Sequence, residues 1–105
     1  MAEQINERLL VMLNGNPHVY EKEGVGGGYP QVWPTRIPVR CIIEVFRSTQ
    51  DFDRTAAMYP QLTHEQVRGA LDYYAAHRER VDEDIERNAR VFQEYLARDP
   101  RSASL

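Results

Sequence analysis

Cysteine is almost missing from this sequence of 105 residues, since Cys41 is its single example. One cysteine can form no disulfide within the chain and cannot build a cysteine cage for zinc. The sequence also lacks a hydrophobic run near the ~20 residues that a membrane-spanning helix needs, and its start carries Glu3 and Glu7 instead of a basic leader. We therefore expect a cytoplasmic protein with no membrane segment.

Lysine is nearly absent as well, because Lys22 is the only one, and the chain carries a net charge of −3. Proteins that bind nucleic acids by themselves usually have a strongly basic balance. No block of this chain forms a basic arm: residues 1–40 carry four acidic and four basic side chains, residues 41–77 five and three, and residues 78–105 seven and six. The charge therefore argues mildly against DNA, while the 42% of hydrophobic residues is enough for one folded domain.

Residues 1–16 are predicted to form a short amphipathic helix. Gly15 offers a left-handed cap, and Pro17 then stops the helix. The hydrophobic positions that recur at helical spacing are Ile5, Leu9, Met12 and Leu13. The chain thus divides into this helix, a core over residues 17–77, and a C-terminal helix with a frayed tail over residues 78–105.

Glycine and proline concentrate in residues 17–39, which hold four of the six glycines and four of the six prolines. Short strands joined by tight turns fit this composition. Because Pro30, Pro34 and Pro38 cannot donate to a β-ladder, the strands should be short and lie at an edge. We expect a small hairpin or β-arm whose free edge needs a partner.

Three helices are predicted after this arm. The first begins near Val39 and ends near Thr49, and Asp51 caps a short second helix that Pro60 ends. Thr63 and Gln66 form the S/T-x-x-E/Q capping box, which starts a third helix at His64. The spacing leaves open whether this helix breaks at residues 77–80 or runs on.

A short helix joined by a tight turn to a capped helix is the outline of a helix-turn-helix, and the β-arm could supply a wing. The fold class we predict is mainly α, with a three-helix helix-turn-helix core, a short N-terminal β-arm or wing, and a long C-terminal helix. The hydrophobic stripe of the third helix is Val67, Ala70, Leu71 and Tyr74. This stripe places Glu65, Gly69 and Asp72 at the centre of the outward face, and Gln66, Arg68 and Tyr73 on its flanks.

The C-terminal segment alternates charges densely over a thin but regular hydrophobic stripe. A solitary helix of this kind gains little from charge pairs, so it needs a partner surface. We expect that surface to be the core, a second copy of the chain, or another protein. The side chains that should contact it are Val81, Ile85, Phe92, Tyr95 and Leu96.

Two ordered motifs resemble a known family. Residues 27–39 resemble G-G-x-P-x-I-x-G-T-R-I-P-V, and residues 59–74 resemble Y-P-x-L-T-x-E-Q-V-x-x-A-L-x-Y-Y. The chain is thus similar, over roughly residues 17–86, to small bacterial uncharacterised-domain proteins grouped with VapB-type antitoxins. Pro34 stands where the family's pattern has glycine, and this restricts the turn before Thr35.

The resemblance implies a dimeric helix-turn-helix or winged-helix protein that neutralises a PIN-like ribonuclease toxin and binds its own operator DNA. Glu and Asp contact only selected bases, so Glu65 and Asp72 make the third helix a mediocre reader of the major groove. Its positive N-terminal end could still receive a phosphate. The DNA-contacting residues we expect are Arg36, Arg40, Thr63, His64, Gln66 and Arg68.

Two alternatives remain open from the residues. The arginines could instead form solvated surface pairs with Glu44, Asp51 and Asp53. The whole core could also be a dimerisation or protein-interaction module that binds no DNA, which the acidic balance favours.

Enzyme functions find little support. His18, His64, His77 and Cys41 do not share the close helical spacing of metal ligands, so we expect no metal and no cofactor. The glycine run at residues 24–28 lacks the following Lys-Ser/Thr of a phosphate loop, and a glycine-rich turn explains it. Nothing near Cys41 is placed to lower the pKa of its thiol, so a small buried residue is the simpler interpretation.

Overall fold

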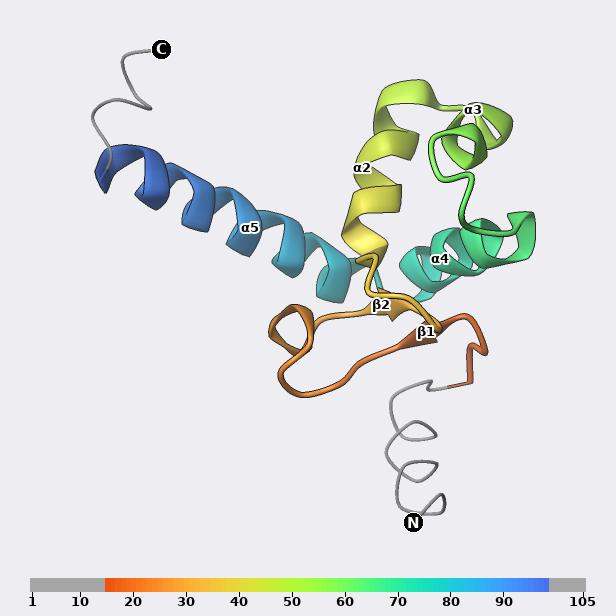
Figure 1. Cartoon of the computed structure of the whole chain (residues 1–105), viewed down its shortest axis with the longest axis horizontal. Helices are drawn as coiled ribbons and strands as arrows, with labels where there is room; N and C mark the ends of the chain where they lie inside the picture. The colour runs from red at the N-terminus through yellow and green to blue at the C-terminus, as the bar shows by residue number, and fades with distance from the viewer. Residues whose placement is uncertain (1–14, 99–105) are drawn as a thin grey trace.

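Four α-helices and a two-stranded hairpin make up residues 15–98, the part of the chain that the computed structural model describes (Figure 1). In chain order the elements are β1 Val19–Tyr20, the 3-10 helix η1 Gly26–Gly28, β2 Gln31–Val32, α2 Val39–Thr49, α3 Phe52–Ala57, α4 His64–Ala76 and α5 Arg78–Arg98. The predicted mainly α fold, with its short hairpin and long C-terminal helix, is confirmed. The predicted helix at residues 1–16 and the frayed end at residues 99–105 fall on residues 1–14 and 99–105, which lie outside the described range.

The hairpin lies against the helices instead of projecting from them. β1 and β2 are antiparallel, with Val19 opposite Val32 and Tyr20 opposite Gln31, and all four residues are buried. The second edge of β2 is also used, because the Val32 amide donates to the Ile37 carbonyl at 2.8 Å. The free edge that we expected to need a partner is therefore partly covered by residues 37–39 of the same chain.

Local signals fix the end of α2 and the start of α3 where the sequence predicts them, whereas α3 ends at Ala57, before the predicted stop at Pro60. α2 ends at Gln50, whose left-handed backbone (φ 51°) lets its amide donate to the Phe46 carbonyl at 2.7 Å. The Asp51 carboxylate then accepts from the Arg54 amide at 2.9 Å and caps α3. Together these caps turn the chain sharply between α2 and α3.

α4 and α5 are separate helices. The backbone at His77 leaves the helical region (φ −134°, ψ 50°), so α4 ends at Ala76 and α5 begins at Arg78. This break resolves the alternative that the sequence left open at residues 77–80. None of the helices between residues 15 and 98 has the length and apolar character that a membrane span requires.

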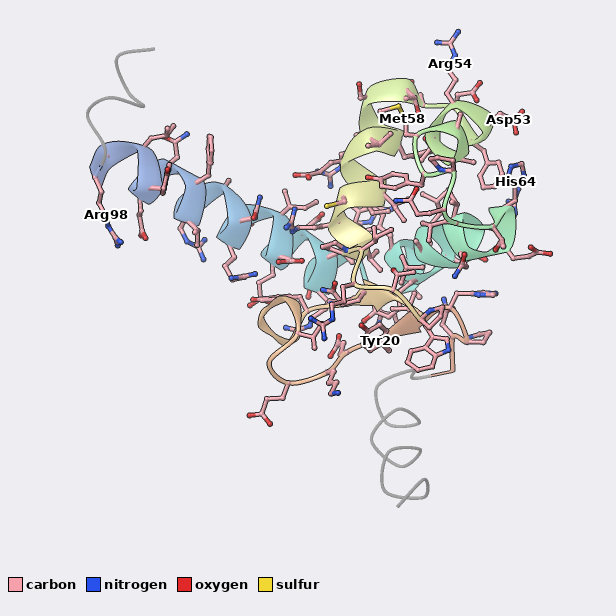
Figure 2. All side chains as sticks on the ribbon, in the orientation of Figure 1. Tyr20, Asp53, Arg54, Met58, His64 and Arg98 are labelled. Atoms are coloured by element: carbon pink, nitrogen blue, oxygen red, sulfur yellow. The ribbon has the colours of Figure 1, made fainter. Side chains whose placement is uncertain are left out.

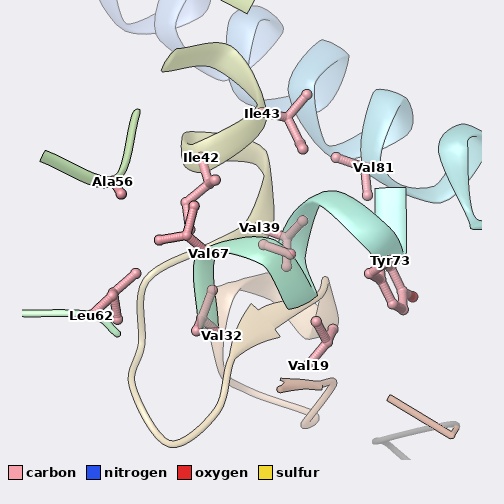
Figure 3. Close-up of a cluster of buried hydrophobic side chains, with 11 residues drawn as sticks. Val19, Val32, Val39, Ile42, Ile43, Ala56, Leu62, Val67, Tyr73 and Val81 are labelled. Carbon is pink, nitrogen blue, oxygen red and sulfur yellow. The ribbon is translucent and has the colours of Figure 1, made fainter. Parts of the chain in front are cut away.

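One hydrophobic cluster holds the hairpin and the four helices together (Figure 3). α2 supplies Val39, Ile42 and Ile43, which are at most 1% exposed, and α4 packs across them. The other members come from the hairpin, α3, the turn before α4, α4 and the start of α5: Val19, Val32, Ala56, Leu62, Val67, Ala70, Tyr73 and Val81. Beyond its first turns α5 extends away from the rest of the molecule (Figure 1).

Candidate functional site

Gln66 joins the beginning of α4 to the turn that follows β2. Its side-chain oxygen accepts from the Thr63 amide at 2.7 Å, and the Thr63 hydroxyl accepts from the Gln66 amide at 3.1 Å, which completes the predicted capping box. The Nε2 of Gln66 donates to the Trp33 carbonyl at 2.9 Å. Both ends of this side-chain amide are therefore used within the chain. Gln66 and Thr63, which we expected to contact DNA, hold the start of α4 against the turn after β2.

The turn after β2 holds Arg36 on a well-supported backbone. The Thr35 hydroxyl donates to the Val32 carbonyl at 2.7 Å and accepts from the Ile37 amide at 3.0 Å. The Tyr20 hydroxyl donates to the Thr35 carbonyl at 2.7 Å. Arg36 is exposed beside these anchors, and the hydrogen bond from Gln66 to Trp33 joins the same turn to the start of α4.

The first turns of α4 present two more basic side chains, both resting on Phe52 of α3. The Arg68 guanidinium carbon lies 4.4 Å from the centroid of the Phe52 ring, and the His64 ring meets the same ring edge-on at 5.5 Å. His64 and Arg68 are exposed, as are Glu65 and Asp72. Figure 2 places His64 on the same side of the molecule as Asp53 and Arg54. Acidic and basic groups therefore alternate over this surface.

We define the α4 surface as Arg36, His64, Glu65 and Arg68, together with the capped N-terminal turn that carries them.

The middle of α4 is covered by the chain itself, and our assignment of its outward face is wrong there. Gly69 is buried because the segment before β1 crosses it: the Asn16 side-chain amide donates to the Gly69 carbonyl at 3.0 Å. A Cβ at Gly69 would lie 2.6 Å from the His18 Cβ, so only glycine admits this crossing. Tyr73, placed on a flank by the spacing, is likewise buried, at 4% exposure.

A shallow depression of about 350 Å³ lies beside this crossing. Residues 15–18 line one side of it, and the polar side chains of α4 line the other: Glu65, Arg68 and Asp72.

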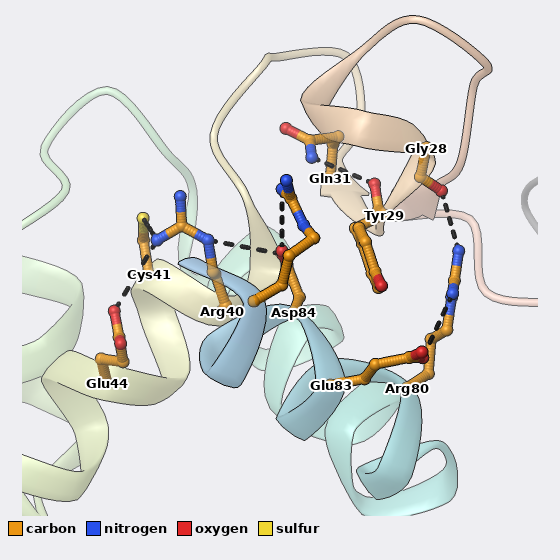
Figure 4. A network of polar contacts seen from close by, with 10 residues as sticks. Gly28, Tyr29, Gln31, Arg40, Cys41, Glu44, Arg80, Glu83 and Asp84 are labelled. Carbon is orange, nitrogen blue, oxygen red and sulfur yellow. Dashed lines mark hydrogen bonds and ion pairs between the residues drawn. The ribbon is translucent and has the colours of Figure 1, made fainter. Parts of the chain in front are cut away.

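Arg40, which we expected to contact DNA, is turned toward α5 and lies outside the α4 surface. Its Nε lies 3.4 Å from the Asp84 carboxylate, which is only 2% exposed, and its NH1 lies 3.8 Å from Glu44 (Figure 4). Arg87 contacts the same Asp84 carboxylate at 3.3 Å. Arg40 therefore fastens α2 to α5, and its Glu44 contact is the surface pairing that the sequence left as an alternative.

The first turns of α5 also contact the glycine-rich loop at residues 24–29. Tyr29 lies between two guanidinium groups, 4.2 Å from that of Arg80 and 4.9 Å from that of Arg87. Arg80 donates to the Gly28 carbonyl at 3.1 Å (Figure 4). This network was not predicted from the sequence. The run of glycines is the sequence feature that could have indicated it, because a Cβ at Gly27 (φ 70°) would lie 3.1 Å from a guanidinium nitrogen of Arg87.

Glu21 links the hairpin to both α4 and α5. Its carboxylate accepts from the Tyr73 hydroxyl at 3.1 Å and from the Arg80 Nε at 3.2 Å. Burial, followed by the negative charge of Glu21, raises the pKa of Tyr73 well above its ordinary value. Tyr73 is therefore a hydrogen-bond donor at any ordinary pH.

The predicted partner-contacting residues of α5 separate into two groups. Val81 is 1% exposed and belongs to the core, and Ile85 packs against that core, so neither is available to another protein. Phe92 and Tyr95 are 57% and 58% exposed, whereas Leu96 is partly buried. The partner of the first turns is thus the core of the same chain, and the outer half of α5 remains uncovered.

Within residues 15–98 the structure shows neither a cluster of metal-ligating side chains nor an activated thiol. No three side chains among His, Cys, Asp and Glu converge on one point within residues 15–98. The Cys41 thiol is partly buried, and this burial raises its pKa, which keeps the thiol protonated.

Known proteins match the part of the chain that contains the hairpin and most of α4. A family model described as "Protein of unknown function (DUF433)" matches residues 20–74, which run from β1 through most of α4. Among solved structures, the chain is similar to a DUF433 member protein from Anabaena variabilis, with 32% sequence identity over 82% of this chain and 85% of that one. The TM-score of the two structures is 0.57. No curated protein matches the chain.

Proposed function

We propose that this chain, which belongs to the DUF433 family of proteins of unknown function, is a DNA-binding regulator of the antitoxin type. In this role the α4 surface binds the operator of the protein's own operon. The protein also neutralises a PIN-like ribonuclease toxin, and it binds DNA better in complex with that toxin than alone.

One observation carries the DNA half of this proposal: the Gln66 side chain ties the capped start of α4 to the turn that bears Arg36. A helix N-terminus attracts anions through its free amides and its dipole. Arg36 lies in the turn that Gln66 joins to this N-terminus, and the exposed His64 and Arg68 lie on the first turns of the helix itself. Such an arrangement suits the phosphate contacts that position a protein on DNA.

The same surface is poorly suited to reading bases. Glu65 and Asp72 point outward from α4, and residues 16–18 cross the helix at Gly69. Only the first turns of α4 can therefore approach a groove, and they carry one acid among their basic groups. We infer that binding to DNA depends chiefly on phosphates and is weak for a single chain, so a second contact must supply the rest of the affinity.

The antitoxin half draws on the two sequence motifs and on α5. The motifs resemble those of VapB-type antitoxins, and the outer half of α5 presents uncovered aromatic side chains to another protein. Charges of both signs along α5 also allow it to approach a basic ribonuclease cleft.

The experiment is a fluorescence anisotropy titration of the full chain with the DNA upstream of its gene, at several salt concentrations, with and without the product of the adjacent gene. We expect binding that weakens as salt rises. Arg36→Ala and Arg68→Ala should each reduce the slope of log K against log salt by about 1, since each removes one phosphate contact.

Arg90→Ala is the matched control, because Arg90 is exposed on α5, away from the α4 surface. It should leave the slope unchanged. Absence of salt-sensitive binding under both conditions would remove the DNA half of the proposal.

A second candidate, a protein-interaction module without DNA binding, is favoured by the exposed Glu65 and Asp72 and by the net charge of −3. Absence of DNA binding by the unchanged protein, both alone and with the product of the adjacent gene, would support it. An adjacent reading frame for a small nuclease with Mg²⁺-binding aspartates would instead support the antitoxin role.

A further inference from the structure

A groove of about 560 Å³ lies where α2, α4 and the first residue of α5 meet (Figure 1). We call it the α2–α4 groove. Its floor is apolar and consists of one buried and three partly buried side chains: Ile43, Phe46, Leu71 and Tyr74. Small-molecule sites have volumes of about 300–1,000 Å³ and combine an apolar lining with a few polar groups. The groove therefore has the size and the floor of such a site, and it shares no residue with the α4 surface.

The rim of the groove carries positive charge and no negative charge. Arg47 and Gln50 belong to the end of α2, and Arg78 begins α5. No Asp or Glu of residues 15–98 lines the groove, although acidic side chains outnumber basic ones in the whole chain. A protein with a net charge of −3 thus has one apolar groove whose rim is basic.

Arg78 supplies the charge on this rim that has no countercharge. Its guanidinium carbon lies 5.0 Å from the centroid of the Tyr74 ring, and no carboxylate of residues 15–98 forms an ion pair with it. Arg47, by contrast, contacts Asp82 at 2.8 Å and the Tyr74 hydroxyl at 2.6 Å. The contact with Tyr74 holds the Arg78 guanidinium beside the apolar floor.

An apolar floor beside one guanidinium without a countercharge suits a ligand that has an apolar body and one anionic end. The rings of Phe46 and Tyr74 favour a flat aromatic body, because aromatic groups gain from offset and edge-to-face contacts. A guanidinium binds a carboxylate through two parallel hydrogen bonds. A carboxylate, with a single negative charge, also matches the charge of Arg78 better than a phosphate, which carries between about 1.5 and 2.

We propose that the α2–α4 groove binds a small aromatic carboxylate. The ring of the ligand lies on the floor against Phe46 and Leu71, and its carboxylate binds the Arg78 guanidinium. This site goes beyond the proposed function, because it needs neither DNA nor a toxin.

The test is an NMR titration of the isotopically labelled full chain with 2-naphthoate and, separately, with 2-naphthamide, which has the same rings and no charge. We expect 2-naphthoate to cause saturable shifts in the amide signals of residues 43–50 and 71–78. 2-Naphthamide should bind about three- to fivefold more weakly, since it cannot form the ion pair with Arg78.

Two arginine variants separate the charge from the floor. Arg78→Gln should weaken the binding of 2-naphthoate about three- to fivefold and leave that of 2-naphthamide unchanged. Arg90→Gln is the matched control, because Arg90 is exposed about 18 Å farther along α5, and it should change neither dissociation constant. Both variants alter exposed side chains, so the fold is preserved.

A third variant tests the floor. Leu71→Ala should weaken the binding of both probes, because it removes part of the surface that both rings contact. If Leu71→Ala fails to fold, the comparison of Arg78→Gln with Arg90→Gln decides the question alone.

Four results would overturn the proposal: no saturable shifts in the groove, equal affinity for the two probes, an affinity for 2-naphthoate that Arg78→Gln leaves unchanged, or shifts centred on the exposed Phe92 and Tyr95. Groove signals that move when the unliganded chain is diluted would assign the groove to a second copy and would also overturn it. A response to the product of the adjacent gene without one to 2-naphthoate would assign the groove to that protein instead. The titrations contain no DNA, so failure of this site and failure of the proposed DNA binding are distinguishable.

Discussion

Replacing Gly69 by alanine tests whether the segment before β1 covers the middle of α4. The new Cβ would lie 2.6 Å from the His18 Cβ and 2.9 Å from two atoms of the His18 ring, closer than van der Waals contact allows. Either the helix or residues 16–18 must move. The bond from the Asn16 side chain to the Gly69 carbonyl, now 3.0 Å long, is then strained or lost.

The expected change in the free energy of unfolding combines opposing effects. Alanine favours a helix interior over glycine by about 1 kcal/mol. Overpacking costs about 1–3 kcal/mol, and loss of the Asn16 hydrogen bond costs about 1 kcal/mol more. We therefore expect Gly69→Ala to destabilise the protein by about 1–3 kcal/mol, although the same change stabilises an uncovered helix.

Urea unfolding followed by circular dichroism measures this free energy, and a His18→Gly background supplies the control. Removing the His18 side chain removes the atoms that a Cβ at Gly69 would meet. In that background Gly69→Ala should stabilise the protein by up to about 1 kcal/mol. A stabilising effect of Gly69→Ala in the otherwise unchanged protein would show that α4 is uncovered at this point.

Three further predictions concern the fastening of α4 and α5. Asp84→Asn should lower the free energy of unfolding by about 3 kcal/mol in urea titrations, because it leaves Arg40 and Arg87 facing a buried site without a countercharge. Thr63→Ala should cost about 1 kcal/mol in the same assay, since it removes half of the capping box. Burial and Glu21 raise the pKa of Tyr73 above 10.0, so its contribution to stability is complete below pH 10 and is lost as pH rises further. Tyr73→Phe should therefore reduce the alkaline fall in stability measured by thermal unfolding above pH 10.

The helices could be predicted from the sequence because their ends depend on neighbouring residues. The Asp51 cap and the box of Thr63 and Gln66 each act over three residues, and both are present where the sequence places them. Arg36, His64 and Arg68 were likewise expected at the surface, and the structure leaves them exposed.

What could not be predicted depends on contacts between distant segments. Gly69 faces outward by helical spacing alone, but Asn16, 53 residues earlier, bonds to its carbonyl. A glycine in the middle of a helix is itself a signal of close approach, and it could have been used. Arg40 and Asp84 lie on different helices, and no spacing rule relates them. The use of Val81 by the core also depends on how α5 crosses α2, which the periodicity of α5 alone does not reveal.

The most direct test of DNA binding by the α4 surface is a titration of the isotopically labelled chain with operator DNA, followed by the backbone amide signals in NMR spectra. We expect the amide signals of residues 33, 35, 36 and 63–68 to shift first and most, and the shifts to weaken with added salt. Shifts confined to α5, or no shifts at low salt, would contradict it.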